Sequence, residues 1–179
     1  MGKMANKLVI GIDLAGSEEN RSGFAIIKEE FGEKDTKSRT IFSDEEILQE
    51  IGRLRPKIVA IDAPITKVKK DRVADKEMKK YGRLSLAIPG MQILAQRADK
   101  LAAKIKKQNI VVLEVNSEAT AQIMGLEKNA LSKSTHQADA ILAAMTGFLH
   151  LEEKTKDVGD KDGFVIIPRP SRKKPVAEK

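Results

Sequence analysis

The sequence predicts an α/β fold built on a mixed β-sheet with helices on both faces. Three short, nearly continuous apolar runs, at residues 8–12, 57–61 and 110–115, are typical of strands buried on both faces. Segments with apolar residues at helical spacing separate these runs along the chain. Strands that alternate with helices form parallel pairs joined by right-handed crossovers, and strands that follow the first run directly make the sheet mixed.

The first strand continues into a meander. Residues 8–12 form the first strand, and Asp13 begins the turn that follows it. Residues 22–28 and 38–42 predict the second and third strands, with a charged turn between them. Because such short connections join antiparallel neighbours, we expect these strands to pair in sequence order.

A helix then leads to the second apolar strand. Ser43 and Glu46 form a capping box, and the apolar residues after them recur at helical spacing, which predicts a helix over 44–55. This helix serves as the crossover that brings the strand at 57–61 alongside the strand at 8–12 in parallel.

The rest of the chain predicts three helices and two strands. They are a polar helix at 71–82, a longer helix starting at Pro89, the strand at 110–115, a helix capped by Ser134 and Gln137, and an edge strand that ends at Pro168. The helix after Ser134 carries several alanines and a glycine, so we expect it to pack closely on its neighbours.

Length and composition indicate one domain and exclude several classes of protein. A chain of 179 residues suits one domain, which we expect at 1–168, followed by a basic disordered tail at 169–179. No apolar run approaches the roughly 20 residues of a membrane span and no secretory signal begins the chain, so we expect a cytoplasmic protein. The absence of cysteine excludes disulfides, a thiol nucleophile and cysteine-ligated zinc or iron–sulfur sites.

The net charge of +7 is concentrated in two segments. Residues 66–83 hold eight lysines and arginines against three acids, and residues 168–179 hold five against one. A basic surplus at defined places is typical of proteins that bind polyanions. The alternatives are a solvated helix face and a disordered basic tail, and charge alone does not decide among them.

Acidic residues follow the predicted buried strands. Asp13 and Asp62 should meet at one edge of the sheet, because the carboxyl ends of parallel neighbours lie together. Glu114 stands near the end of the third apolar strand, and Asp139 lies early in the last helix, one turn after His136. Two carboxylates about 4 Å apart repel by about 4 kcal/mol at an effective dielectric constant near 20, so such a cluster requires cations. An oxygen-only donor set favours Mg²⁺ or Mn²⁺.

Each of these residues also has a structural alternative. Asp13 and Asp62 are placed to hydrogen-bond their own turns, and Asp139 to interact with a helix dipole. Glu114 can pair with an arginine or lysine or lie at an exposed strand end, and His136 can be a surface residue. The sequence leaves these alternatives open.

Several blocks of sequence together resemble a known family. They are residues 11–17 (Gly-Ile-Asp-Leu-Ala-Gly-Ser), 61–64 (Ile-Asp-Ala-Pro), 71–82, 89–91, Arg97, 114–115, 136–140 and 162–168. Over nearly all of residues 8–168 the chain resembles the family of predicted nucleases with an RNase H-like fold, catalogued as domain of unknown function family 429. The chain departs from the family pattern at Asn116-Ser117, where an aromatic–proline pair is expected, and at Gln137-Ala138, where an acid and a larger apolar residue are expected.

The resemblance implies an RNase H-like fold with a five-stranded mixed sheet. It places family-type acids at Asp13, Asp62 and Asp139, with Glu114 as a further one. We therefore expect a metal-dependent nuclease in which these four residues hold Mg²⁺ or Mn²⁺ and His136 orders substrate or water. The fold-level part of this inference is an analogy.

Basic residues are expected to hold the nucleic acid by its phosphates. The candidates are Lys69, Lys70, Arg72, Lys80 and Arg97. An aromatic content of 3% offers few stacking platforms, so a structured DNA or RNA is favoured over base-by-base reading of a single strand.

Two other classes of function compete with a nuclease. A non-catalytic nucleic-acid-binding protein on the same fold would bind without metal. A phosphotransferase of the actin-like and sugar-kinase superfamily shares the strand–Asp–turn–Gly-Ser opening, but it needs a second such domain, for which we expect no room in 179 residues.

Overall fold

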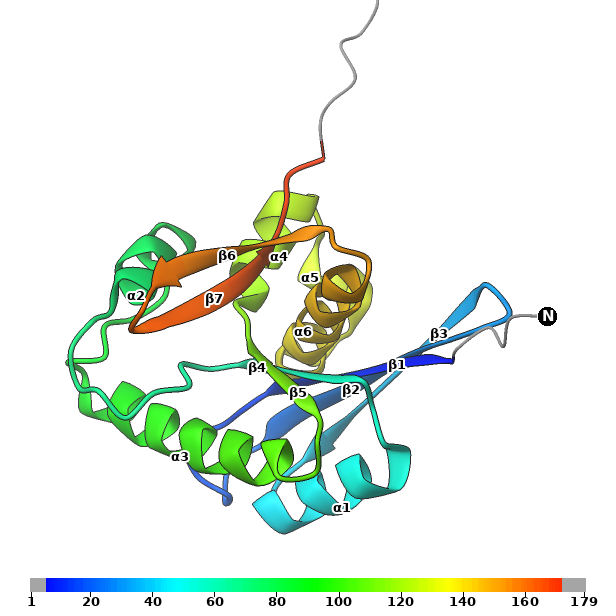
Figure 1. The fold of residues 1–179 in the computed structure, drawn as a ribbon, viewed down its shortest axis with the longest axis horizontal. Coiled ribbons are helices and arrows are strands. Elements are labelled where there is room, and N and C mark those ends of the chain that lie inside the picture. The colour runs from blue at the N-terminus through cyan, green and yellow to red at the C-terminus, as the bar shows by residue number, and fades with distance from the viewer. Residues whose placement is uncertain (1–5, 172–179) are drawn as a thin grey trace, which may run out of the picture.

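A mixed five-stranded β-sheet forms the centre of the computed structural model, which describes residues 6–171 (Figure 1). The strands lie in the order β3-β2-β1-β4-β5. They are β1 (Lys7–Asp13), β2 (Ser22–Glu30), β3 (Glu33–Ile41), β4 (Ile58–Asp62) and β5 (Val111–Glu114). β2 pairs antiparallel with β1 and β3, whereas β4 pairs parallel with β1 and β5. The predicted α/β fold, with the five-stranded mixed sheet of an RNase H-like fold, is confirmed.

Helices cover both faces of the sheet, as predicted. They are α1 (Asp44–Leu54) and α3 (Pro89–Lys106) on one face and α6 (Thr135–Leu151) on the other. In Figure 1, α1 and α3 lie below the sheet, where they pack against Ile10 and Ile12 of β1. α6 lies above it and packs against Val9 of β1 and Ala60 of β4. Alternate side chains of β1 therefore point to opposite helix layers, Ile10 and Ile12 to α1 and α3 and Val9 to α6.

The two predicted capping serines set the starts of two helices, although the reciprocal bonds of a full capping box are absent among the described residues. The hydroxyl of Ser43 accepts a hydrogen bond from Glu46 N at the start of α1, and that of Ser134 accepts one from Gln137 N at the start of α6. Each bond satisfies one of the backbone donors that a helix start leaves free.

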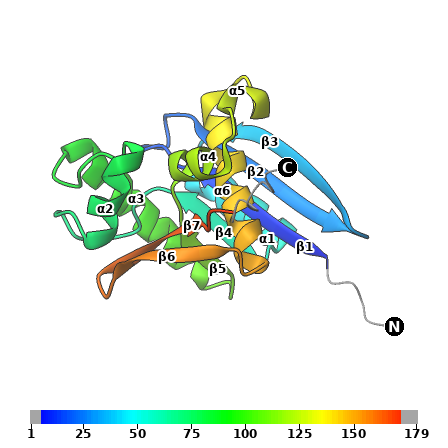
Figure 2. The same ribbon diagram turned by 90° about the horizontal axis from the view of Figure 1, so that it is seen from above.

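The connections contain elements that the sequence predicted incompletely. They are α2 (Val73–Met78), the 3₁₀ turn η1 (Lys79–Tyr81), α4 (Ser117–Met124), α5 (Lys128–Leu131), β6 (Thr155–Asp160) and β7 (Gly163–Pro168). The polar helix expected over 71–82 is α2 followed by η1. The expected edge strand, β7, pairs with β6 in a separate hairpin that extends from the end of α6 toward α2 (Figure 2). α4, α5 and β6 were not predicted.

α6 lies unusually close to β1 and β2. A Cβ atom on Gly11 would overlap the carbonyl oxygen of Ala140, and one on Gly23 would overlap the carbonyl oxygen of His136. Only glycine permits this approach, because the helix backbone occupies the space of the missing side chain. The contact brings the first turns of α6 to the carboxyl end of β1.

The structure does not reach all of the predicted tail. Residues 1–5 and 172–179 lie outside the described residues. At the last described positions, Arg169 N donates a 2.9 Å hydrogen bond to Lys154 O. Across the part of the chain that is described, we find no helix with the length and hydropathy of a membrane span.

Candidate metal centre

Two of the predicted acids are direct neighbours in the sheet. Asp13 ends β1, Asp62 ends β4, and the two are paired in the parallel register. Paired residues on adjacent strands point to the same face, and this is the face covered by α6, because Gly11 lies two residues before Asp13 and contacts that helix. Both carboxylates therefore emerge beneath the start of α6, at the carboxyl edge where α/β sheets bind ligands.

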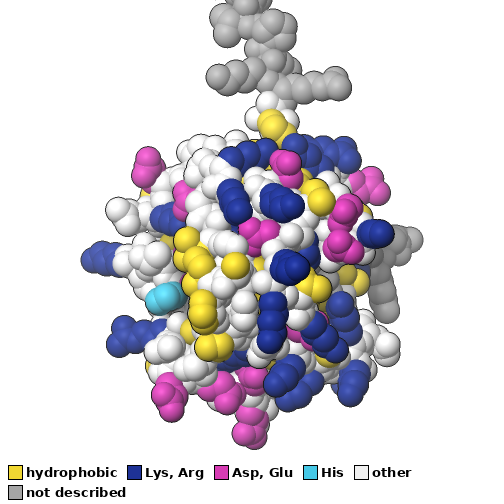
Figure 3. All heavy atoms as spheres, turned by 90° about the vertical axis from the view of Figure 1, so that its left-hand side faces the viewer, with side chains coloured by type: hydrophobic (Ala, Val, Ile, Leu, Met, Phe, Trp, Pro, Cys, Tyr) yellow, Lys and Arg dark blue, Asp and Glu magenta, His cyan; other side chains and the backbone are white. Residues whose placement is uncertain are grey.

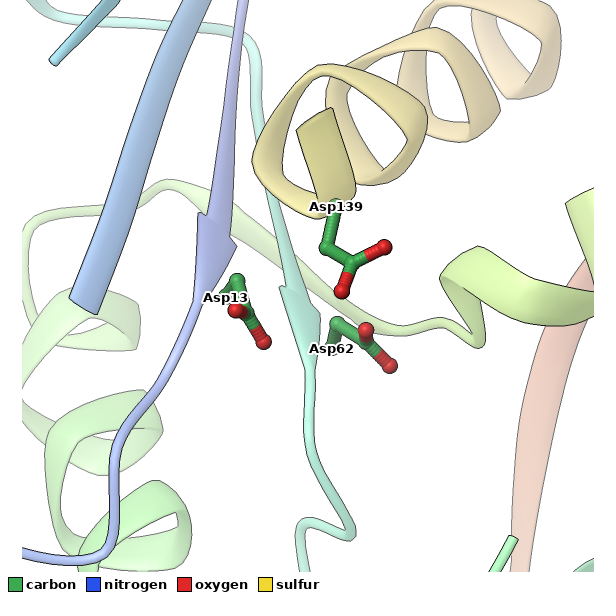
Figure 4. Close-up of side chains that lie close together, drawn as sticks. All are labelled: Asp13, Asp62 and Asp139. Atoms are coloured by element: carbon green, nitrogen blue, oxygen red, sulfur yellow. The ribbon is translucent and has the colours of Figure 1, made fainter. Parts of the chain in front are cut away.

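Asp139 of α6 completes the group. Figure 4 shows the three carboxylates turned toward one another from the ends of β1 and β4 and from the first turns of α6. One oxygen atom from each of Asp13, Asp62 and Asp139 lies within 4.8 Å of the other two. We call this group the carboxylate triad. Three acids from segments about 50 and 75 residues apart thus meet as the sequence predicted.

The triad resists full ionisation. Burial, followed by the nearby charge of Asp62, raises the pKa of Asp13 to about 7, although the contact with His136 opposes this shift. His136 Nδ1 lies 2.9 Å from Asp13 Oδ2, and the imidazole is half exposed. Burial also raises the pKa of Asp62, against the effect of a hydrogen bond that the Ser117 hydroxyl donates to it. A cation placed among these groups would relieve the repulsion between them.

Asp139 has a cation beside it already. Lys128 Nζ lies 2.8 Å from Asp139 Oδ1 and 2.7 Å from Glu118 Oε2. Apart from this ion pair, Asp139 Oδ1 has no hydrogen-bond partner among the described residues. Although burial favours the neutral amine, the two carboxylates raise the pKa of Lys128 to about 12, so this lysine stays charged.

A pocket of about 220 Å³ opens beside the triad. Asp62 and Asp139 line it together with Arg83, Ser117 and Lys128. The triad offers three hard oxygen donors beside an open pocket, which together suit a metal ion. The three residues can therefore hold a metal ion.

Glu114 does not belong to the triad. It pairs with Ile61 in the parallel register, and Ile61 faces α1 and α3, whereas its neighbour Asp62 faces α6. Glu114 therefore points to the opposite side of the sheet, where its carboxylate accepts hydrogen bonds of 3.0 and 2.7 Å from Arg72 and one of 3.1 Å from Ile65 N. The prediction that Glu114 binds the metal with the other acids is corrected, and the arginine alternative holds.

Two of the predicted phosphate-binding residues have structural roles. Arg72 is buried between Glu114 and Asp75, and its Nε lies 2.7 Å from Asp75 Oδ2. Arg97 is also buried, where it donates to Asp44 and to the carbonyl oxygens of Ala15 and Phe42. Neither guanidinium is free to meet a phosphate, so both predictions are corrected.

The three predicted lysines lie on the surface. Lys69, Lys70 and Lys80 are exposed, and among the described residues Lys80 pairs with Glu77 at 3.6 Å while the other two form no ion pair. Lysine and arginine side chains are prominent on the face of the molecule formed by α2 and the start of α3 (Figure 3). Their role in phosphate binding stays a prediction.

Sequence reasoning missed three residues at the site. Ser117 hydrogen-bonds Asp62, Lys128 neutralises Asp139, and Arg83 joins the pocket to the cluster around Glu114. Ser117 had a signal in the sequence, because Asn116-Ser117 is a dipeptide at which the chain departs from the pattern of the family that it resembles. Lys128 had none, because it belongs to a four-residue helix that no periodicity reveals.

Known proteins give no further guide to the site, since no family model matches the chain and no curated protein matches it.

Proposed function

We propose that the protein is a metal-dependent nuclease that hydrolyses phosphodiester bonds with the help of Mg²⁺ or Mn²⁺ held by Asp13, Asp62 and Asp139. The observation that carries this proposal is the convergence of three carboxylates whose repulsion the surrounding side chains only partly offset. A divalent ion bound there would lower the pKa of a water molecule and stabilise the departing oxygen. The resemblance to predicted nucleases with an RNase H-like fold supports the same conclusion.

The chain's own residues prepare the site for this reaction. Ser117 and His136 orient two of the acids, since Ser117 hydrogen-bonds the carboxylate of Asp62 and His136 contacts that of Asp13. The exposed Lys69, Lys70 and Lys80 supply positive charge for the phosphate backbone, which would give a sequence-independent grip that weakens with salt.

The first test combines metal binding with cleavage. Mn²⁺ or Mg²⁺ should raise the melting temperature of the purified protein and support cleavage of at least one substrate among DNA, RNA, DNA–RNA hybrid and branched DNA. Asp13→Asn should remove both effects, because it removes one ligand charge. Asp35→Asn, which changes an exposed acid in β3, is the matched control and should retain both.

The outcome separates the two main classes of function. A melting temperature that metal leaves unchanged would contradict the metal site. If nucleic acid still bound tightly in EDTA, such a result would favour a non-catalytic nucleic-acid-binding protein on this fold.

A further inference from the structure

Lys128 holds a position that a simple structural ion pair does not explain. It contacts Asp139, one of the three triad acids, and at the same time Glu118, which lies outside the triad. Its side chain lines the pocket and keeps 29% of its surface exposed. The ammonium therefore lies beside both Asp139 and the pocket that a substrate would enter.

The ammonium and a divalent cation compete for the same charge. A metal ion held by all three triad acids must lie close to Asp139, and Lys128 Nζ is 2.8 Å from Oδ1 of that residue. Two cations at such short range repel strongly in a partly buried site. Lys128 must therefore leave Asp139, or metal binding is weakened by its presence.

The surroundings of Lys128 allow its side chain to move away from Asp139. Glu118 Oε2 already lies 2.7 Å from the ammonium, and it can remain the partner of Lys128 when a metal ion binds Asp139. α5 is a short helix of four residues, none of them buried, so a shift of its side chains breaks little packing. The movement leaves a positive charge at the rim of the pocket.

We propose that Lys128 is the resident counter-ion of the triad, which a divalent cation displaces from Asp139 so that the ammonium becomes a phosphate-binding group. The first half of this proposal concerns metal binding alone. The second half rests on the proposed nuclease function, because it requires a phosphate in the pocket. Metal binding and substrate binding are then coupled through one side chain.

The metal half is tested without nucleic acid. Binding of Mn²⁺ to the folded protein is measured by isothermal titration calorimetry for Lys128→Met and for the wild type at one temperature. Removing the competing charge should lower the dissociation constant for Mn²⁺ by about tenfold. Lys133→Met, which removes an exposed lysine five residues away, is the matched control and should behave as the wild type.

A dissociation constant that is unchanged or higher in Lys128→Met would overturn the proposal. Lys128→Gln keeps a polar side chain and replaces the methionine variant if that one does not fold. Because binding to the folded protein is measured at one temperature, a lower stability of the variant does not affect the comparison.

The substrate half is tested by binding of a DNA duplex in two buffers. With Ca²⁺, which occupies carboxylate sites but commonly supports no cleavage, the wild type should bind with a steeper salt dependence than Lys128→Met, by about 0.9 in the slope of log K against log salt. In EDTA, where Asp139 retains the lysine, the two slopes should agree.

A slope difference in both buffers, or in neither, would refute the phosphate-binding role. Absence of any nucleic-acid binding by the wild type would count against the proposed nuclease, whereas the Mn²⁺ titration would still decide the metal half.

Discussion

Two clusters of acids lie at the same end of the sheet, on opposite faces, and their charges are balanced differently. Glu114 and Asp75 are buried with Arg72 and Arg83, so two negative charges meet two positive ones. On the other face, the three acids of the triad have the ammonium of Lys128 beside Asp139 and feel the charge of Arg83 at Asp62, while the half-exposed imidazole of His136 contacts Asp13. The cluster around Glu114, with its charges paired, stabilises the fold, whereas the triad, with more negative than positive charge, is able to bind a cation.

The cluster around Glu114, whose charges are balanced, helps to position the pocket beside the triad. Arg72 and Arg83 anchor the segment between β4 and α3 to β5, and Arg83 Nη2 also donates to Val115 O. The same segment carries the exposed lysines and forms one wall of the pocket beside the triad. The ion pairs around Glu114 thus fix the position of this segment, and their acidic partners are not members of the triad.

The largest expected effect comes from breaking the balanced cluster. Arg72→Met should lower the free energy of unfolding by about 3–5 kcal/mol, because it leaves Glu114 and Asp75 buried with half of their positive charge. Urea denaturation measures the change. Lys69→Met, on the exposed part of the same segment, should change stability by less than about 0.5 kcal/mol. A similar small loss for Arg72→Met would show that the cluster is not essential for the fold.

The second effect tests how the triad is assembled. Gly11→Ala should lower the free energy of unfolding by about 1–3 kcal/mol, since the new methyl group overlaps the backbone of α6 at Ala140. Because α6 must shift away from β1, the Mn²⁺-induced rise in melting temperature should also shrink. Gly52→Ala in α1 is the matched control, where the added Cβ meets its nearest neighbour, Gln108 Oε1, at 3.7 Å. It should increase stability by about 0.5–1 kcal/mol.

The dependence of stability on pH also distinguishes the clusters. The pKa of Asp13 is raised in the folded state to about 7 from an ordinary value of 3.8, so the folded protein binds this proton more tightly than the unfolded chain. The resulting stability is present below pH 4 and is lost as the pH rises to about 7. In EDTA, the wild type should therefore lose more stability than Asp13→Asn between pH 4.5 and 7.5.

Metal should reverse this dependence. The apparent affinity for Mn²⁺ should increase as the pH rises toward 7, because the ion binds the ionised carboxylate. Parallel pH profiles for the wild type and Asp13→Asn in EDTA would contradict the raised pKa of Asp13 and with it the electrostatic contrast between the clusters.

The sequence predicted the sheet and the triad because both follow from short-range patterns. Buried strands that end in an acid, together with a parallel crossover, suffice to place Asp13 beside Asp62, and the capping serine, Ser134, fixes the start of the helix that carries Asp139. Glu114 was misplaced because both faces of β5 are apolar, so alternation puts it on the face of Val112 but only the register with β4 shows that this face lies opposite the triad.

Other features had no local signal. Apart from Asp75, three residues after Arg72, the partners that bury Arg72 and Arg97 lie between 42 and 82 residues away in the chain, and the sequence does not show whether a basic residue is solvated or buried. β6 contains two aspartates and a glycine and gains its strand conformation by pairing with β7. Tertiary contacts therefore determine that these two arginines are buried and that β6 is a strand, which composition does not reveal.

The smallest effect on stability, and a selective one on binding, is expected from the surface lysines. Replacing Lys69, Lys70 and Lys80 together with methionine should leave the free energy of unfolding nearly unchanged, because all three are exposed. Their loss should weaken nucleic-acid binding strongly at low salt and little at high salt, since each phosphate contact contributes about 0.9 to the salt slope. Replacement of Lys104, Lys106 and Lys107 on α3 and its end is the matched control. An equal loss of affinity at both salt concentrations would remove this surface from the proposed substrate path and leave the triad without its basic approach.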